Sequence, residues 1–177
     1  MHQTARTQSL SFVSDRALRI LLAEDNRQLR GLLTTALHGD GHMVEEVSDG
    51  GELLEYLATL IVEGREDEVD VIISEQELPG IPGLSVLAGL RARRQEVPFV
   101  LMTGDGLVQA RAVALGGVIL DRPFNLGAIR GCIHRAVAEV GALDREIWTP
   151  ANDVRLSEGH SQEMGATAIR PRLWKGK

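Results

Sequence analysis

Short apolar runs alternate with longer amphipathic segments along most of the chain. The apolar runs stand at residues 19–23, 42–47, 70–74, 98–102 and 117–120. Four of the five are almost purely apolar, which is typical of parallel strands that helices cover on both faces. The pattern therefore predicts an α/β fold with five strands, each followed by a helix.

Apolar residues at helical spacing fill the segments between these runs. Residues that commonly start a helix stand before the expected helices at Asn26, Asp49, Pro82–Gly83 and Asn125. Gly39 stands where the first helix should end. We expect five helices, of which the one over residues 107–115 has the weakest pattern.

Two segments fall outside this alternation. Residues 1–17 and 144–177 are polar and aperiodic, so we expect tails on either side of one domain over residues 18–143. The C-terminal tail holds both tryptophans, Trp148 and Trp174, in a chain with only 3% aromatic residues, which favours docking on a surface. It contains no recognition-helix pattern of a DNA-reading domain, so we expect a single-domain protein.

Composition narrows the class of protein. A formal charge of −6 argues against a general grip on nucleic acid phosphates, which needs clustered Lys and Arg. The single cysteine, Cys132, cannot form an intrachain disulfide, and the N-terminus lacks the apolar centre of a signal peptide. No apolar run approaches the roughly 20 residues of a membrane helix. We therefore expect a cytoplasmic protein with no nucleic acid or membrane partner.

Polar residues stand at the carboxyl ends of the predicted strands, where open α/β sheets bind ligands. They are Glu24 and Asp25 after the first strand, Glu75 after the third, Thr103 after the fourth, and Asp121, Arg122 and Pro123 after the fifth. The carboxylates of Glu24, Asp25 and Glu75, brought together, would repel one another, so a cation should accompany them. Either Arg122 or a bound Mg²⁺ could supply this positive charge. The simpler alternative is that these residues only solvate strand ends and cap helices.

Four motifs carry a specific resemblance. The stretches "ILLAEDN", "DVIISEQELPGIPGL", "PFVLMTG" and "DRPF" occur in the order found in the receiver domain of bacterial two-component response regulators. This region, from about Arg19 to Val140, resembles that domain. The resemblance implies a flavodoxin-like, doubly wound parallel sheet of five strands in the order 2-1-3-4-5 with five helices. It also implies a role in two-component phosphorelay signalling, with a histidine kinase or a downstream effector as partner.

The resemblance assigns roles to several residues. In the family, an aspartate at the end of the third strand accepts a phosphoryl group from a histidine kinase, beside Mg²⁺ held by an acidic pair. Glu24 and Asp25 match that pair, and the backbone carbonyl of Glu77 falls where the metal receives a main-chain oxygen. Thr103 matches the hydroxyl that senses the phosphate. Pro123 matches a proline whose preceding peptide bond is expected to be cis.

Three residues depart from the family pattern. Glu75 stands where the phosphoacceptor aspartate belongs, Arg122 replaces a lysine, and Ile119 replaces an aromatic switch residue. The stretch 103–122 is also a few residues shorter than usual, which puts the fourth helix in doubt. The departures all concern one switching apparatus, so the sequence indicates an atypical receiver, or pseudo-receiver.

Glu75 is the residue on which the interpretation depends. Phosphoryl transfer relies on positioning, so a nucleophile displaced by one methylene should not be phosphorylated efficiently. Its longer side chain should instead reach toward Thr103 and Arg122, like an oxygen of a phosphoryl group. The planar fork of Arg122 suits a bidentate ion pair with this carboxylate. Ile119 cannot reproduce the movement of an aromatic switch, which favours a constitutive binding surface.

We therefore expect a phosphorylation-independent signalling module that is not an enzyme and acts by protein–protein interaction, with Glu75 as a phospho-mimic. Its binding surface should comprise the last two helices and the fifth strand. Three alternatives stay open: a decayed site, a receiver that still accepts phosphoryl from a histidine kinase with Mg²⁺, and a small-ligand α/β domain. The oligomeric state is also open, with a homodimer as one candidate.

Overall fold

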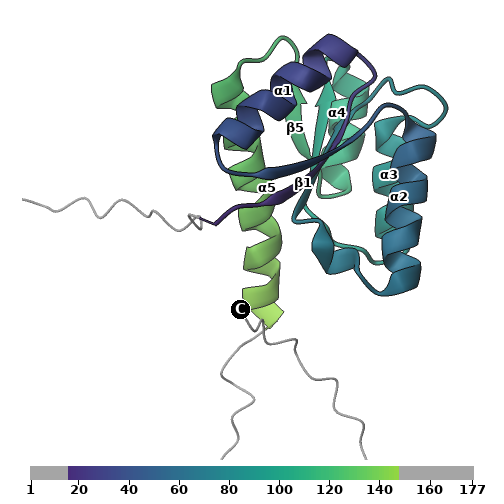
Figure 1. Cartoon of the computed structure of the whole chain (residues 1–177). Coiled ribbons are helices and arrows are strands. Elements are labelled where there is room, and N and C mark those ends of the chain that lie inside the picture. The colour runs from purple at the N-terminus through teal and green to yellow at the C-terminus, as the bar shows by residue number, and fades with distance from the viewer. Residues whose placement is uncertain (1–15, 148–177) are drawn as a thin grey trace, which may run out of the picture. The chain divides into compact units, whose positions relative to one another are not determined.

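Five parallel strands form one sheet in the computed structural model, which describes residues 16–147 (Figure 1). The strands are β1 (Arg19–Ala23), β2 (Met43–Val47), β3 (Val71–Glu75), β4 (Phe99–Thr103) and β5 (Val118–Asp121). Their order is β2-β1-β3-β4-β5, and every neighbouring pair is parallel. This is the flavodoxin-like, doubly wound order implied by the resemblance, and the predicted fold class is confirmed.

Five α-helices connect the strands. They are α1 (Arg27–Gly39), α2 (Gly50–Glu63), α3 (Gly83–Ala92), α4 (Gly106–Ala114) and α5 (Leu126–Ile147), with a 3-10 turn, η1 (Glu66–Glu68), before β3. The expected caps are present: Asn26 accepts the backbone N–H groups of Gln28 and Leu29, and Asp49 accepts that of Glu52. Each satisfies N–H groups that would otherwise lack a partner at the start of a helix.

Helix α4, which the short stretch 103–122 put in doubt, is formed. Asp105 caps it, with Oδ1 accepting the N–H groups of Leu107 and Val108. At Gly117, directly before β5, a Cβ atom would lie 2.8 Å from a methyl of Leu87. Glycine therefore lets the chain turn closely beneath α4 and enter the last strand after a short connection.

The helices cover both faces of the sheet. Helices α1 and α5 lie on one face, and α2 and α3 lie on the other (Figure 1). Alternate strand residues enter the two cores, so the inner strands are buried on both sides and read as apolar runs. The edge strand β2 is mostly exposed, which explains why its sequence was the mixed one. Full burial of one Leu, Ile or Val side chain stabilises the folded chain by about 1.5–3 kcal/mol relative to leaving it exposed.

Our expectations for the two tails fall mainly on residues 1–15 and 148–177, outside the described part of the chain. Helix α5 extends through Ile147, beyond the expected boundary at residue 143. Within residues 16–147, no helix combines the length and apolar character needed to cross a membrane.

Candidate functional site

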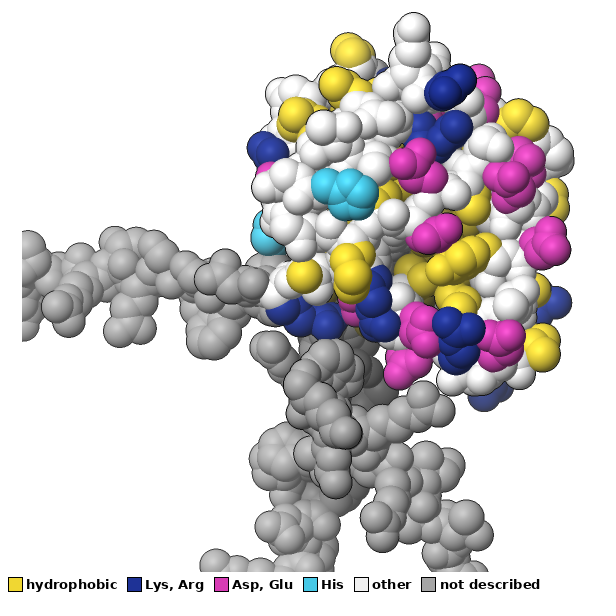
Figure 2. Space-filling view, in the orientation of Figure 1, with side chains coloured by type: hydrophobic (Ala, Val, Ile, Leu, Met, Phe, Trp, Pro, Cys, Tyr) yellow, Lys and Arg dark blue, Asp and Glu magenta, His cyan; other side chains and the backbone are white. Residues whose placement is uncertain are grey.

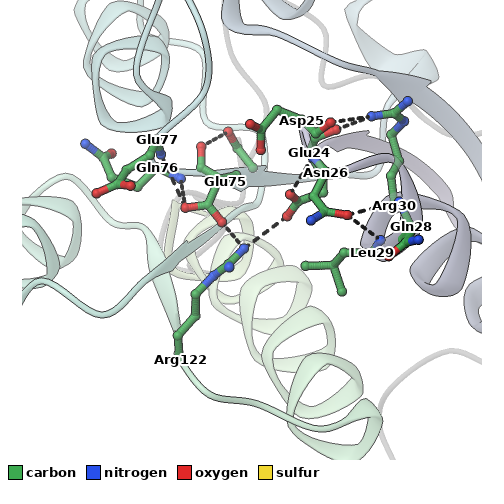
Figure 3. Close-up of polar contacts among 11 residues, drawn as sticks. Glu24, Asp25, Asn26, Gln28, Leu29, Arg30, Glu75, Gln76, Glu77 and Arg122 are labelled. Atoms are coloured by element: carbon green, nitrogen blue, oxygen red, sulfur yellow. Dashed lines mark hydrogen bonds and ion pairs between the residues drawn. The ribbon is translucent and has the colours of Figure 1, made fainter.

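Three polar side chains are buried at the carboxyl ends of adjacent strands. Glu24 follows β1 and is 1% exposed, Glu75 ends β3 and is 6% exposed, and Thr103 ends β4 and is 4% exposed. Because β3 lies between β1 and β4, the topology brings these residues to one edge of the sheet. Figure 3 shows the carboxylates of Glu24 and Glu75 turned toward Arg122, which follows β5.

The start of α3 holds the backbone of Glu75 in place. A Cβ atom at Gly83 would lie 2.5 Å from the carbonyl oxygen of Glu75 and 2.7 Å from Oγ of Ser74, so only glycine permits this approach. Ser74 in turn donates its hydroxyl hydrogen to the same carbonyl oxygen at 2.9 Å. The close packing within the "SEQELPGIPG" segment therefore fixes the backbone from which the Glu75 side chain projects.

Both carboxylate oxygens of Glu75 have hydrogen-bond donors. Oε1 accepts the backbone N–H groups of Gln76 at 3.0 Å and Glu77 at 3.2 Å. Oε2 accepts a hydrogen bond from the guanidinium of Arg122, with which it also forms an ion pair. The extra methylene of glutamate thus lets the carboxylate fold back on its own loop and still meet Arg122.

Arg122 bridges two buried carboxylates through one nitrogen. Its Nη2 donates to Oε2 of Glu24 at 3.0 Å and to Oε2 of Glu75. The ring centroid of Phe124 lies 5.8 Å from the guanidinium carbon, a cation–π distance that helps to orient the side chain. We expected a bidentate fork on Glu75, and this detail was wrong, because the carboxylates of Glu24 and Glu75 share a single nitrogen.

The surroundings of Glu24 raise the pKa of its carboxyl. Burial raises the pKa of this carboxyl above its ordinary value, and the N–H of Asn26, which donates to Oε1 at 3.0 Å, opposes the shift. The charge of Glu75 and a hydrogen bond with Asp25 raise the pKa further, whereas Arg122 lowers it. Arg122 therefore neutralises part of a repulsion that burial makes costly.

Two of the predicted site residues direct no described side-chain bond to Arg122. Asp25 and Glu77 are both exposed. The backbone carbonyl of Asp25 accepts from Arg30 at 3.4 Å (Figure 3). Arg30 also pairs with Glu46 at 3.2 Å, which ties the loop after β1 to β2. The N–H of Glu77 contributes to the pocket by donating to Glu75.

Thr103 lies at the same edge but bonds elsewhere. Its Oγ1 accepts the backbone N–H of Asp105 at 3.1 Å, just before α4. We expected the Glu75 carboxylate to approach Thr103, and its described hydrogen bonds run to Arg122 and to its own loop instead. A charged guanidinium is a stronger donor to a carboxylate than a neutral hydroxyl.

Gln109 on α4 connects that helix to the pocket, and no sequence motif points to this residue. Its Nε2 donates to Oδ1 of Asp121 at 2.9 Å and to the carbonyl of Thr103 at 3.4 Å. Because Asp121 directly precedes Arg122, contacts run from Glu75 through Arg122 and Asp121 to α4. The pairing depends on the register of Thr103 beside Asp121, which no local pattern reveals.

Ile119 and Pro123 complete the predicted set. Ile119 is half-buried in β5, and its carbonyl oxygen accepts from Sγ of Cys132 at 3.3 Å and from Arg135 at 3.4 Å. These bonds join β5 to α5. The peptide bond between Arg122 and Pro123 is cis, as the resemblance implied.

The chain's sequence matches a known domain across this whole site. Residues 20–131 match the response regulator receiver domain. The chain belongs to this family. Receiver domains act in two-component signalling, and the matched residues include the carboxyl ends of all five strands.

Curated relatives agree with this assignment. The transcriptional regulatory protein TcrA of Mycobacterium tuberculosis is 34% identical over 157 residues, which cover 86% of this chain and 59% of TcrA. The response regulator MprA of Mycolicibacterium vanbaalenii is 28% identical over 139 residues, covering 75% of this chain and 57% of MprA. The chain thus spans somewhat more than half the length of these relatives.

Solved structures support the fold. The chemotaxis response regulator CheY4 of Vibrio cholerae superposes with a TM-score of 0.57 at 23% identity, covering 68% of this chain and 99% of CheY4. NtrX from Brucella abortus gives a TM-score of 0.61 at 22% identity, covering 75% of this chain and 30% of NtrX. At these identities the similarity concerns the fold of the receiver.

Receiver domains typically bind Mg²⁺ in their acidic pocket, and the side chains present here do not fit that ion. Mg²⁺ requires oxygen ligands in near-octahedral geometry. The carboxylate oxygens of Glu24 and Glu75 instead accept N–H donors, and Arg122 supplies the positive charge between them. Among residues 16–147, no group of three or more His, Cys, Asp or Glu side chains is arranged to hold a metal.

Proposed function

We propose that this chain is an atypical response regulator that signals by protein–protein interaction without phosphorylation of an aspartate. In this account Glu75 acts as a built-in substitute for a phosphorylated side chain. The partner is a signalling protein of the two-component class, either a histidine kinase or a downstream effector. The pairing of Glu75 with Arg122 is the observation that carries the proposal.

Glu75 is poorly suited to accept a phosphoryl group. A phosphoacceptor carboxylate needs a free oxygen in line with the phosphoryl donor, and both oxygens of Glu75 already accept hydrogen bonds. Attack would require Oε2 to leave Arg122 or Oε1 to leave two backbone N–H groups. The arrangement therefore favours a carboxylate that is held as a fixed charge over one that reacts.

The face of α4, β5 and α5 is suited to carry the signal. Helix α4 exposes two large apolar side chains, Leu107 at 81% and Val113 at 60%. This helix is joined to the pocket by Gln109, which contacts the residue next to Arg122. A fixed charge in the pocket can thereby hold α4 and β5 in one arrangement, and the exposed apolar residues supply contacts for a partner.

Charge also favours a protein partner over nucleic acid. Exposed Glu45, Glu46, Glu52 and Glu55 lie on β2 and α2. Figure 2 shows acidic side chains spread over the side of the domain that α2 occupies. Such a surface repels phosphate groups.

A receiver that still accepts phosphoryl is the second candidate, because Glu24, Asp25 and Thr103 are retained at the expected strand ends. The full chain would be incubated with acetyl phosphate and MgCl₂, and its intact mass measured. We expect no phosphate adduct on the wild-type chain and an adduct on the double variant Glu75→Asp/Arg122→Lys, which restores both family residues. An adduct on the wild-type chain at an acid of the pocket would establish the second candidate.

A further inference from the structure

The positive charge at the centre of the pocket is part of the polypeptide. The Arg122 guanidinium lies between the carboxylates of Glu24 and Glu75, whose side chains are 1% and 8% exposed. Its own side chain is 39% exposed, so it closes the pocket on the solvent side. Phe124, whose ring is 5.8 Å from the guanidinium carbon, supports it from the following loop.

A divalent ion and this guanidinium compete for the same oxygens. The two Oε2 atoms accept from Arg122, and the two Oε1 atoms accept backbone N–H groups of Asn26, Gln76 and Glu77. An ion bound to the same carboxylates would lie beside the guanidinium and be repelled by it. The ion would also have to displace N–H groups that already donate to these oxygens at normal hydrogen-bond distances.

We propose that Arg122 is a tethered cation that stands in place of a bound metal, and that its removal lets a divalent ion reach the carboxylates of Glu24 and Glu75. The pocket of the wild-type chain therefore keeps its arrangement without metal. This inference concerns the pocket of the proposed function but does not rest on its independence of phosphorylation. A metal-binding measurement tests it alone.

The experiment uses Mn²⁺, which takes the same carboxylate and water ligands as Mg²⁺ and broadens nearby NMR signals. The full-length chain is titrated with Mn²⁺ while the backbone amide signals of Asn26, Gln76 and Glu77 are followed. The variants are Arg122→Gln and, as a matched control, Arg130→Gln, which removes an arginine paired with Asp40 away from the strand ends. Arg122→Lys is included because it keeps a positive charge that supports folding.

We expect saturable broadening at these three amides in Arg122→Gln, with affinity at least about tenfold above that of the wild type and of Arg130→Gln. Arg122→Lys should fall between, since lysine is a point charge that cannot reach both carboxylates in the same way. Adding Glu24→Gln to Arg122→Gln should abolish the new site. Wild-type binding equal to that of Arg122→Gln, or no binding by either Arg122 variant, would overturn the proposal.

Discussion

Arg122 and Glu75, which are 47 residues apart in the sequence, form an ion pair across the carboxyl edge of the sheet. One partner ends β3 and the other follows β5, so the pair closes over the end of β4 between them. The resemblance to receiver domains implies an aspartate at position 75 and a lysine at position 122, and the two residues that stand there instead fit one another. A glutamate is long enough to reach the guanidinium, and an arginine can donate to two carboxylates at once.

Removal of Arg122 should destabilise the domain. Breaking a fully buried ion pair by deleting one partner costs about 3–5 kcal/mol. The Arg122 side chain is 39% exposed, so water screens part of the loss. We expect Arg122→Ala to lower the free energy of unfolding by about 2 kcal/mol in urea titrations at neutral pH.

Arg130→Ala is the matched control for this loss. Arg130 also forms an ion pair, with Asp40, but its side chain is 45% exposed and its partner's is 27% exposed. We expect the urea midpoint of this variant to be close to that of the wild type. Equal midpoints for Arg122→Ala and Arg130→Ala would mean that the bridge does not stabilise the fold.

Glu24 should make stability depend on pH. Its pKa in the folded chain is raised above the ordinary value of 4.5, first by burial. A raised carboxyl pKa means that its contribution to stability is full below pH 4.5 and is lost as pH rises through the folded-state pKa. Glu24→Gln does not titrate and keeps an oxygen for Asn26, so the loss should be absent in this variant.

The measurement is a series of urea titrations of both proteins from below pH 4.5 upward. We expect the free energy of unfolding of Glu24→Gln, relative to that of the wild type, to increase with pH and then level off. A difference between the two proteins that stays constant with pH would contradict the assignment of this raised pKa to Glu24.

Helix α4 should depend on its cap. Asp105 satisfies the N–H groups of Leu107 and Val108, and loss of such a cap costs about 1 kcal/mol. In Asp105→Ala we expect faster amide hydrogen exchange throughout α4. Asp49→Ala, which removes the cap of α2, should accelerate exchange in α2 and leave α4 unchanged. Faster amide exchange in both helices in either variant would show that α4 does not open independently of α2.

The strands were predictable because burial on both faces leaves a nearly continuous apolar run. The convergence of Glu24, Glu75 and Thr103 followed from the rule that parallel strands end at one edge. The cap of α4 was missed because Asp105 stands in "GDG", a stretch typical of a loop. The sharing of one Arg122 nitrogen between two carboxylates, and the bond from Gln109 to Asp121, depend on strand register and side-chain conformations that no sequence pattern encodes.

In the proposed function, the Glu75 charge acts through Arg122 to hold α4 and β5 in one arrangement. The direct measurement compares backbone amide chemical shifts of wild type and Glu75→Gln, which keeps the size of the side chain and removes its charge. We predict shift changes that extend from the pocket to Gln109 and Ile119, whereas the remote control Asp40→Asn leaves both residues unchanged. Changes confined to residues 74–77 and Arg122 would contradict the account and indicate a decayed site.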